Sequence, residues 1–432
     1  MSKTGTLTRH FRNALLAFLA TGVVAAATPA IAEDTPAKML PGAKLLHKFA
    51  KKVYRIPVLL ATEKGPRLLV WEDDFDPEPP RRPYDFNKAP EPRFDLIFWD
   101  VAANKQLHKM SVPKETVPLS PVPSSMSSPG APIPFGTLAF SPDGKQLAYV
   151  TTTHKAIPGK PFQEASTRIK LYDAAKRKWQ EAIPTVFKTE YYPRIPRVLF
   201  APDGALVFLE GATCSVQEPG KARPCKKFQV ARAPSYKKNP HSNEIRQAVL
   251  SPDASQLAVA ADGMVTVYDL ATGKKVFQAT RSAPEAKTTF GQNVMWASLA
   301  FAPSQGEQKL LAVEIVTGPP KRFVLARVFD LKAKKEVSRK TLAQQATKGG
   351  RFGMNGPLPS WGRAHAYYTA DGQPRILFDG KLHDGASGKV LHKFDEEQGV
   401  FVSRDGKYLV RLTGAKGDKT MGVEVWSPEK IK

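Results

Sequence analysis

The sequence has little cysteine and few of the local patterns that mark chemistry on a single segment. Its 432 residues include two cysteines and eight histidines, with no His-x-x-x-His or Cys-x-x-Cys pair. It also contains no Gly-x-Ser-x-Gly, no Gly-x-Gly-x-x-Gly and no phosphate loop with Gly-Lys-Ser or Gly-Lys-Thr. These absences exclude the zinc sites, nucleophile elbows, dinucleotide fingerprints and P-loops that leave a local signature. A catalytic set assembled from distant segments leaves no such signature and stays open.

No apolar run reaches the roughly 20 residues that a membrane-spanning helix needs. The longest, 14–27, follows three basic residues and precedes an Ala-x-Ala pattern at 30–32. This order is typical of a secretory signal peptide. We therefore expect a signal peptide at 1–32 and a periplasmic or secreted mature domain, 33–432, with no transmembrane span after cleavage. An uncleaved anchor is the alternative.

Acidic residues are outnumbered, 40 against 64 lysines and arginines, which gives a net charge of +24. Nucleic acid is one partner that such a balance can attract. The basic residues are spread through turns, however, and an exported protein rarely meets nucleic acid. We expect no nucleic-acid binding, and we expect an unknown protein or an anionic envelope ligand as the partner. Solubility alone is the alternative reason for the charge.

The two cysteines, Cys214 and Cys225, flank a short loop, 215–224. In an oxidising compartment a disulfide that closes this loop is the natural interpretation. A metal site would need further ligands nearby, and the sequence shows none. We therefore predict a structural disulfide between Cys214 and Cys225, with no metal and no cofactor.

A repeat dominates the rest of the chain, and 248–274 is its best copy. Three short apolar runs are separated there by Ser251-Pro252-Asp253-Ala254 and by Asp262-Gly263, a strong hairpin signal. A fourth run starts at Val276. The pattern predicts four antiparallel strands, which cannot bury their faces alone and should be one copy of several.

Two signatures recur along the chain in the same order. The first is an apolar run followed by a Ser/Ala-Pro turn, with prolines at 142, 202, 252 and 303, spaced by 60, 50 and 51 residues. The second is an aromatic residue, then Asp, then Lys five residues after that Asp. It occurs at Trp99-Asp100, Tyr172-Asp173, Tyr268-Asp269 and Phe329-Asp330, and with His at His383-Asp384.

Recurrence in copy after copy favours a structural role for these residues. We expect each aromatic residue to pack between sheets and each Asp to cap its turn. The aspartates that we assign to repeat turns are Asp143, Asp173, Asp203, Asp253, Asp269, Asp330 and Asp405.

Both signatures resemble the WD40-like β-propeller superfamily, including bacterial repeats built around a Ser-Pro-Asp-Gly turn and an Asp-Leu-Ala-Thr-Gly-Lys turn. The resemblance covers nearly the whole chain after the leader. It implies an all-β fold, a seven-bladed β-propeller of four-stranded antiparallel blades, with six or eight blades as alternatives. Residues 44–49 have the character of an outer strand with no blade before them. They should complete the last blade beside the strand ending at Trp426, because such closure removes an exposed sheet edge.

Three insertions, 72–92, 111–134 and 344–359, interrupt the repeats. They are rich in Pro, Gly or Ser, or in acidic residues, and should be loops. The acidic cluster that starts at Glu72 lacks the spacing of a calcium loop, so we interpret it as a solvated loop.

Propellers host many unrelated activities, so the fold alone does not give the function. The sequence favours a monomeric, non-catalytic binding or scaffold module at the cell envelope. One alternative is a propeller-type enzyme, lactonase-like or quinoprotein-like, with its site at the channel mouth. Another is an envelope-associated propeller of the TolB kind.

Overall fold

The computed structural model describes residues 43–428, apart from short breaks and longer gaps at 49–57, 74–93, 112–137, 157–162, 181–187, 190–196, 231–244, 283–292, 347–363, 395–399 and 414–421. All described residues belong to one unit, Lys38–Lys432. The expected signal peptide, 1–32, lies outside them. Every regular element in the described ranges is a β-strand, and none of these residues forms a helix long and apolar enough to cross a membrane.

Six of the sheets are four-stranded antiparallel meanders. The strands of the first three are β2 (Val58–Thr62), β3 (Gly65–Asp73), β4 (Phe94–Asp100) and β5 (Lys105–Ser111); β11 (Arg197–Phe200), β12 (Leu206–Glu210), β13 (Thr213–Gln217) and β14 (Lys226–Gln229); β15 (Gln247–Leu250), β16 (Gln256–Ala261), β17 (Met264–Asp269) and β18 (Lys275–Thr280). Those of the others are β19 (Asn293–Phe301), β20 (Lys309–Thr317), β21 (Lys321–Asp330) and β22 (Lys335–Ala346); β23 (His365–Tyr368), β24 (Pro374–Phe378), β25 (Lys381–Asp384) and β26 (Val390–Lys393); β1 (Ala43–Lys48), β27 (Val400–Val402), β28 (Leu409–Thr413) and β29 (Gly422–Pro428).

The remaining sheet departs from this form. Its strands are β6 (Leu138–Phe140), β7 (Gln146–Ala156), β8 (Gln163–Asp173), β9 (Lys178–Trp179) and β10 (Lys188–Thr189), and both β9 and β10 pair with β8. The expectation of seven four-stranded blades is therefore wrong: in the part of the chain that the structure describes, six blades have four strands and this sheet has five.

The outer edge of this sheet is divided into β9 and β10, and the pairing register with β8 explains why. Trp179 lies opposite Tyr172, and Lys188 lies opposite Ser166. The outer chain thus advances nine residues (188 − 179) while β8 advances six (172 − 166). Three surplus residues cannot keep the ladder in register, so the outer edge is divided between two short strands.

The N-terminal strand completes the sheet that contains the C-terminal strands, as the sequence predicts for 44–49. β1 pairs antiparallel with β29, and Leu45 lies opposite Trp426. A register shift between Leu45 and His47 marks an irregularity in this ladder. The order β1-β29-β28-β27 therefore joins both ends of the described chain in one sheet.

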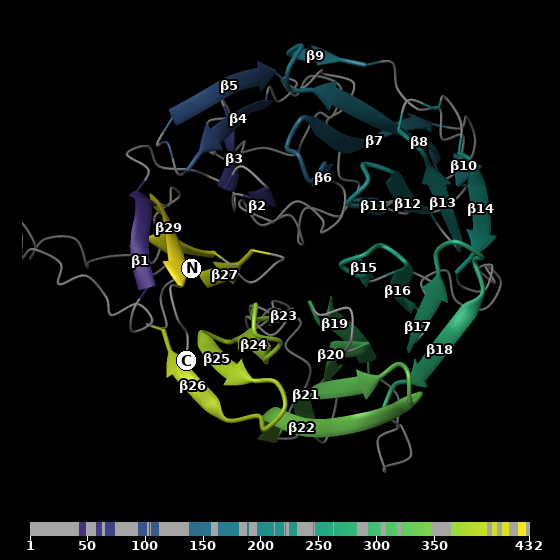
Figure 1. Cartoon of the computed structure of the whole chain (residues 1–432), viewed down its shortest axis with the longest axis vertical. Helices are drawn as coiled ribbons and strands as arrows, with labels where there is room; N and C mark the ends of the chain where they lie inside the picture. The colour runs from purple at the N-terminus through teal and green to yellow at the C-terminus, as the bar shows by residue number, and fades with distance from the viewer. Residues whose placement is uncertain are drawn as a thin grey trace, which may run out of the picture. The chain divides into compact units, whose positions relative to one another are not determined.

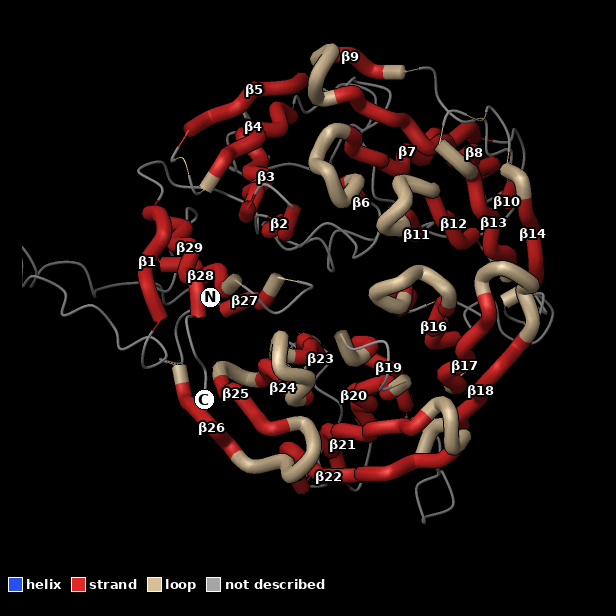
Figure 2. The backbone as a smooth tube through the Cα atoms, viewed as in Figure 1, coloured by secondary structure: helices blue, strands red, loops and turns tan. Residues whose placement is uncertain are grey.

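The sheets follow one another around a ring (Figure 1). The first strand of each sheet is innermost and the last is at the rim, except in the sheet that joins the chain ends, where β27 is innermost and β1 is at the rim (Figure 1). Short turns connect strands within several sheets, among them β17 to β18 and β21 to β22 (Figure 2). Contacts between β15 and β19, and between β19 and β23, show that consecutive sheets pack on one another.

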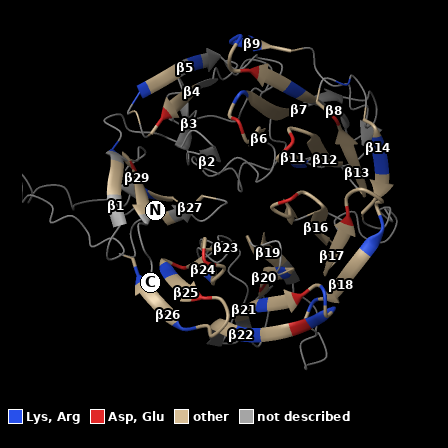
Figure 3. Ribbon diagram, viewed as in Figure 1, with Lys and Arg blue, Asp and Glu red and all other residues tan. Residues whose placement is uncertain are grey.

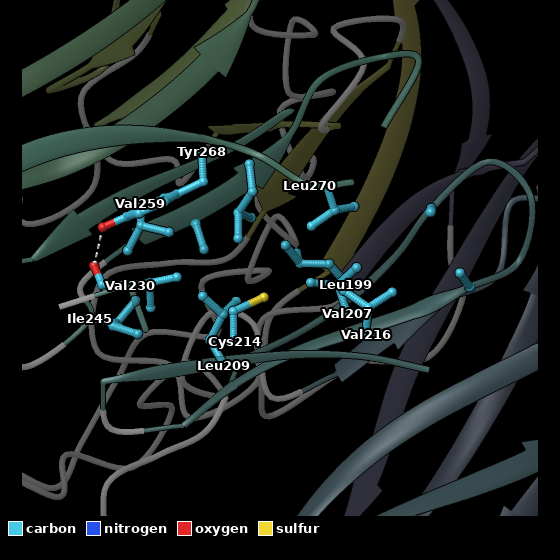
Figure 4. Packing of buried hydrophobic residues seen from close by; sticks show 14 of the residues in the cluster. Leu199, Val207, Leu209, Cys214, Val216, Val230, Ile245, Val259, Tyr268 and Leu270 are labelled. Carbon is cyan, nitrogen blue, oxygen red and sulfur yellow. Dashed lines mark hydrogen bonds between the residues drawn. The ribbon is translucent and has the colours of Figure 1, made fainter. Parts of the chain in front are cut away.

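The hydrophobic core lies between neighbouring sheets, because each blade has two apolar faces to bury. One cluster joins Leu199, Val207 and Cys214 from one blade to Val259 and Tyr268 from the next (Figure 4). Further clusters of the same kind join the other pairs of adjacent blades for which the structure describes both faces.

The expected insertions are only partly within the described residues. β3 includes residues 72 and 73, β5 includes Ser111, and β22 runs to Ala346, so the strands extend further than the sequence indicated. The remainder of each insertion lies outside the described residues.

Candidate functional site

The Ser-Pro-Asp turns connect the first and second strands of a blade and are held by one hydrogen-bond pattern. The Ser141 hydroxyl donates to Asp143 Oδ1 at 2.6 Å and accepts the Gln146 N–H at 2.8 Å. Asp143 Oδ1 also accepts the Lys145 N–H at 3.0 Å. The hydrogen bond from Ser141 holds the pKa of Asp143 below its usual value.

The other copies repeat or simplify this arrangement. Ser251 donates to Asp253 at 2.6 Å and likewise holds the pKa of that carboxyl below its usual value. Asp203 accepts the Ala205 N–H at 2.9 Å, with Ala201 in the serine position. Asp405 lies outside the described residues.

The aromatic-Asp turns connect the third and fourth strands. Asp269 accepts the N–H and the hydroxyl of Thr272 at 2.7 and 2.6 Å, and these bonds lower the pKa of Asp269. Asp173 accepts the Lys176 N–H at 3.0 Å, and Asp330 accepts the Ala333 N–H at 2.7 Å. Each of these carboxylates therefore satisfies N–H groups of its own turn.

The aromatic residues before these aspartates lie between blades. The Tyr268 hydroxyl donates to the Val230 carbonyl of the preceding blade at 2.7 Å (Figure 4). Phe329 packs against Phe277, with ring centroids 5.4 Å apart. His383 takes the aromatic place in one blade, where it is buried and its Nδ1 lies 3.3 Å from the Gly388 carbonyl oxygen.

The predicted disulfide is wrong: Cys214 and Cys225 are both free. Strand register explains the separation, because Cys214 lies opposite Phe228, three residues beyond Cys225. Three residues along a strand span roughly 10 Å, too far for a disulfide. Cys214 instead faces the core between blades, where burial raises the pKa of its thiol to about 12.

A buried charge cluster that the sequence did not reveal joins two blades. Arg327 donates to Glu314 at 3.3 Å, to Glu336 at 2.7 Å and to the Thr280 carbonyl of the neighbouring blade at 2.8 Å. Glu314 is fully buried and also accepts the Ser282 N–H at 2.8 Å. Burial alone would raise the pKa of Glu336, but hydrogen bonds from arginine side chains lower it to about 2.

Three of the outermost strands carry exposed basic and exposed apolar side chains close together in the sequence. In β5 and β22 the outward positions are, respectively, Lys105, Leu107 and Lys109, and Lys335, Val337 and Arg339, all of them exposed. In β26 they are Leu391 and Lys393. We call these residues the rim surface. Figure 3 shows that basic residues recur on the outer strands, while acidic residues recur in the turns.

The apolar members of the rim surface are exposed to solvent. Leu107 is 37% exposed, Val337 46% and Leu391 40%, and Leu45 of β1 is 41% exposed. Lysines on an edge strand prevent edge-to-edge pairing of sheets. Exposed leucine and valine between them add nothing to that protection, and they offer apolar contact area to a partner.

One shallow pocket interrupts the rim between two blades. It is lined by Lys275, Val276, Phe277 and Gln278 of β18 and by Lys334 from the turn between β21 and β22. We call it the rim pocket. No group of three or more His, Cys, Asp or Glu residues comes together as a metal site among the residues that the structure describes.

Comparison with solved structures identifies distant similarity across most of the chain. The Cps50 (Swd1) beta-propeller domain from Myceliophteria thermophila shares 12% identity, with a TM-score of 0.45, and the match covers 88% of this chain and 99% of that one. A chain of the Mitotic Checkpoint Complex shares 9% identity, with a TM-score of 0.34, and covers 87% and 88%. No protein-family model and no curated protein matches the sequence. On its sheet topology and its repeated turns, the chain is a β-propeller of antiparallel blades.

Proposed function

We propose that the protein is an exported, non-catalytic β-propeller that binds another protein at the cell envelope through its outer strands. The observation that carries the proposal is the rim surface, where exposed Leu107, Val337 and Leu391 stand next to exposed lysine and arginine side chains. A surface that is both basic and apolar suits a partner that offers acidic and apolar side chains together.

Charge supports the same partner chemistry. The whole chain carries +24, and long-range attraction between such a protein and an acidic partner speeds their encounter. Export is supported by the basic residues, the apolar run 14–27 and the Ala-x-Ala pattern at 30–32. A mature domain starting near residue 33 would keep nearly all of that positive charge.

Two measurements test the proposal. Fractionation of the producing cells should recover the chain, shortened at its N-terminus, outside the cytoplasm. Affinity capture from envelope extract should then recover a protein that rebinds when both proteins are purified. Replacing Leu107, Val337 and Leu391 together by threonine should weaken the rebinding, whereas Thr341→Ala, an exposed polar control on β22, should not. Equal binding by both variants would refute a role for the rim surface.

A further inference from the structure

The turn after Asp330 holds a lysine where two equivalent turns hold glycine and a third holds Arg177. Four residues after the turn aspartate, Gly273 and Gly388 have φ angles of 69° and 77°, and Lys334 has a φ of 52°. Only glycine enters this left-handed region without steric cost. A basic side chain at such a position points to a use for the side chain, because backbone strain of this kind collects at functional sites.

Lys334 and Lys275 both line the rim pocket. Lys275 Nζ donates to Gln278 Oε1 at 2.7 Å, and Gln278 Nε2 lies 2.6 Å from Met264 Sδ. These contacts hold the Lys275 ammonium group in place. Val276 is partly exposed and Phe277 is 7% exposed, so the pocket lining combines apolar side chains with two lysines.

Further lysines follow or precede the pocket residues in the sequence. Lys274, Lys332 and Lys335 are exposed and form no ion pair with any other described residue. The nearby carboxylates are engaged, since Asp330 accepts an N–H of its own turn and Glu336 is bound by two arginines. An anionic group that enters the pocket would therefore meet a concentration of exposed lysines.

We propose that the rim pocket binds an acidic peptide segment of a protein partner, with carboxylates at Lys275 and Lys334 and an apolar side chain on Val276 and Phe277. This inference rests on the proposed function and specifies the class of ligand. An acidic peptide fits better than an anionic membrane, because a recessed floor admits a single side chain but not a plane of lipid headgroups. The shallow depth agrees with an extended peptide rather than a buried small molecule.

The structure supplies a matched pair of variants for the test. Lys334→Gly removes one positive charge from the pocket and relieves the left-handed backbone. Arg177→Gly is the control. It also removes one positive charge and relieves a left-handed backbone, since Arg177 has a φ of 52° in an equivalent turn, but Arg177 is not among the residues that line the pocket. Both variants of the full chain should melt at the same temperature as the parent or slightly above it, so lost binding cannot be attributed to unfolding.

The probe is a short labelled peptide in which glutamate and leucine alternate, and its affinity is measured by fluorescence anisotropy. Lys334→Gly should weaken binding about threefold, and Lys334→Gly combined with Lys275→Gln about tenfold. Arg177→Gly should leave the affinity unchanged. A peptide with glutamine in place of glutamate should bind much more weakly, and binding of the acidic peptide should weaken as salt is added.

Equal losses in Lys334→Gly and Arg177→Gly would show attraction to the net charge alone and would overturn the pocket. An unchanged affinity in the double variant would also overturn it. If Lys334→Gly reduced binding to vesicles of phosphatidylglycerol and phosphatidylcholine but not to the peptide, the ligand would be a lipid surface. If the captured protein partner bound Lys334→Gly at full strength, the pocket would be wrong and the proposed function would stand.

Discussion

Replacing Arg327 by methionine would test whether the buried charge cluster holds two blades together. The substitution leaves Glu314, which is fully buried, with the Ser282 N–H as a partner but without the guanidinium that faces it. Breaking a buried ion pair from one side typically costs about 3–5 kcal/mol of unfolding free energy. The lost bond to the Thr280 carbonyl and the contacts of Arg327 with the Trp296 and Phe329 rings, 5.3 and 4.9 Å from their centroids, add to the cost. We expect Arg327→Met to lower the unfolding free energy by about 4 kcal/mol.

A second variant separates two effects: the cost of a buried carboxylate left without its cation, and the cost of the packing contacts that Arg327 loses. Glu314→Gln combined with Arg327→Met removes both charges and keeps an acceptor for Ser282, so we expect a loss of about 1–2 kcal/mol, the size of one hydrogen bond and a cation–π contact. Arg339→Met is the control, because this side chain is 51% exposed and its pair with Glu336 is worth under about 1 kcal/mol. Urea denaturation followed by tryptophan fluorescence measures all three. The reasoning fails if Arg327→Met costs less than about 1 kcal/mol or if the double variant is no more stable than the single one.

Three other outcomes follow from single turns and side chains. Ala254 has a φ of 54°, and Gly204 has a φ of 83° in the same turn of another blade. Ala254→Gly should therefore raise the unfolding free energy by about 0.5 kcal/mol, and Gly204→Ala should lower it. A change of the same sign in both variants would contradict this reasoning. Burial lowers the pKa of His383 below 6.5, so protonation favours the unfolded chain. The unfolding free energy should therefore fall as the pH drops below about 6.5. In denaturation curves, His383→Phe should make the unfolding free energy depend less on pH. A thiol reagent should modify exposed Cys225 in the native protein and buried Cys214 only after denaturation, and a reductant should leave the melting temperature unchanged; a shift on reduction would imply a disulfide.

The blades were predictable from the sequence because their turns are local. Asp143 and Ser141 are two residues apart, and Asp269 and Thr272 are three apart. A few consecutive residues therefore determine each hydrogen-bonded turn. Once those turns are placed, the strands between them follow. Pairing of residues 44–49 with the last sheet was predictable for a similar reason, since a blade with too few strands leaves an open edge.

Features that depend on register or on neighbouring blades were not predictable in this way. The separation of Cys214 from Cys225 depends on which residues of β13 and β14 face each other. The division of one outer edge into β9 and β10 depends on three surplus residues measured against β8. The contact of Arg327 with Thr280 joins positions 47 residues apart, and no sequence spacing records it. The rim pocket likewise combines one strand with a turn of the next blade.

The sheet that unites β1 with β29 also sets the order in which the molecule can be completed. Ala43 lies opposite Pro428, 385 positions later in the chain (428 − 43), so this ladder has nothing to pair with until nearly all of the polypeptide has emerged. The other sheets are built from neighbouring segments and can assemble as the chain appears. Pairing of β1 with β29 should therefore be a late folding step with a large loop-closure entropy cost. Until it occurs, the edge of β29 is unpaired and can pair with a strand of another polypeptide.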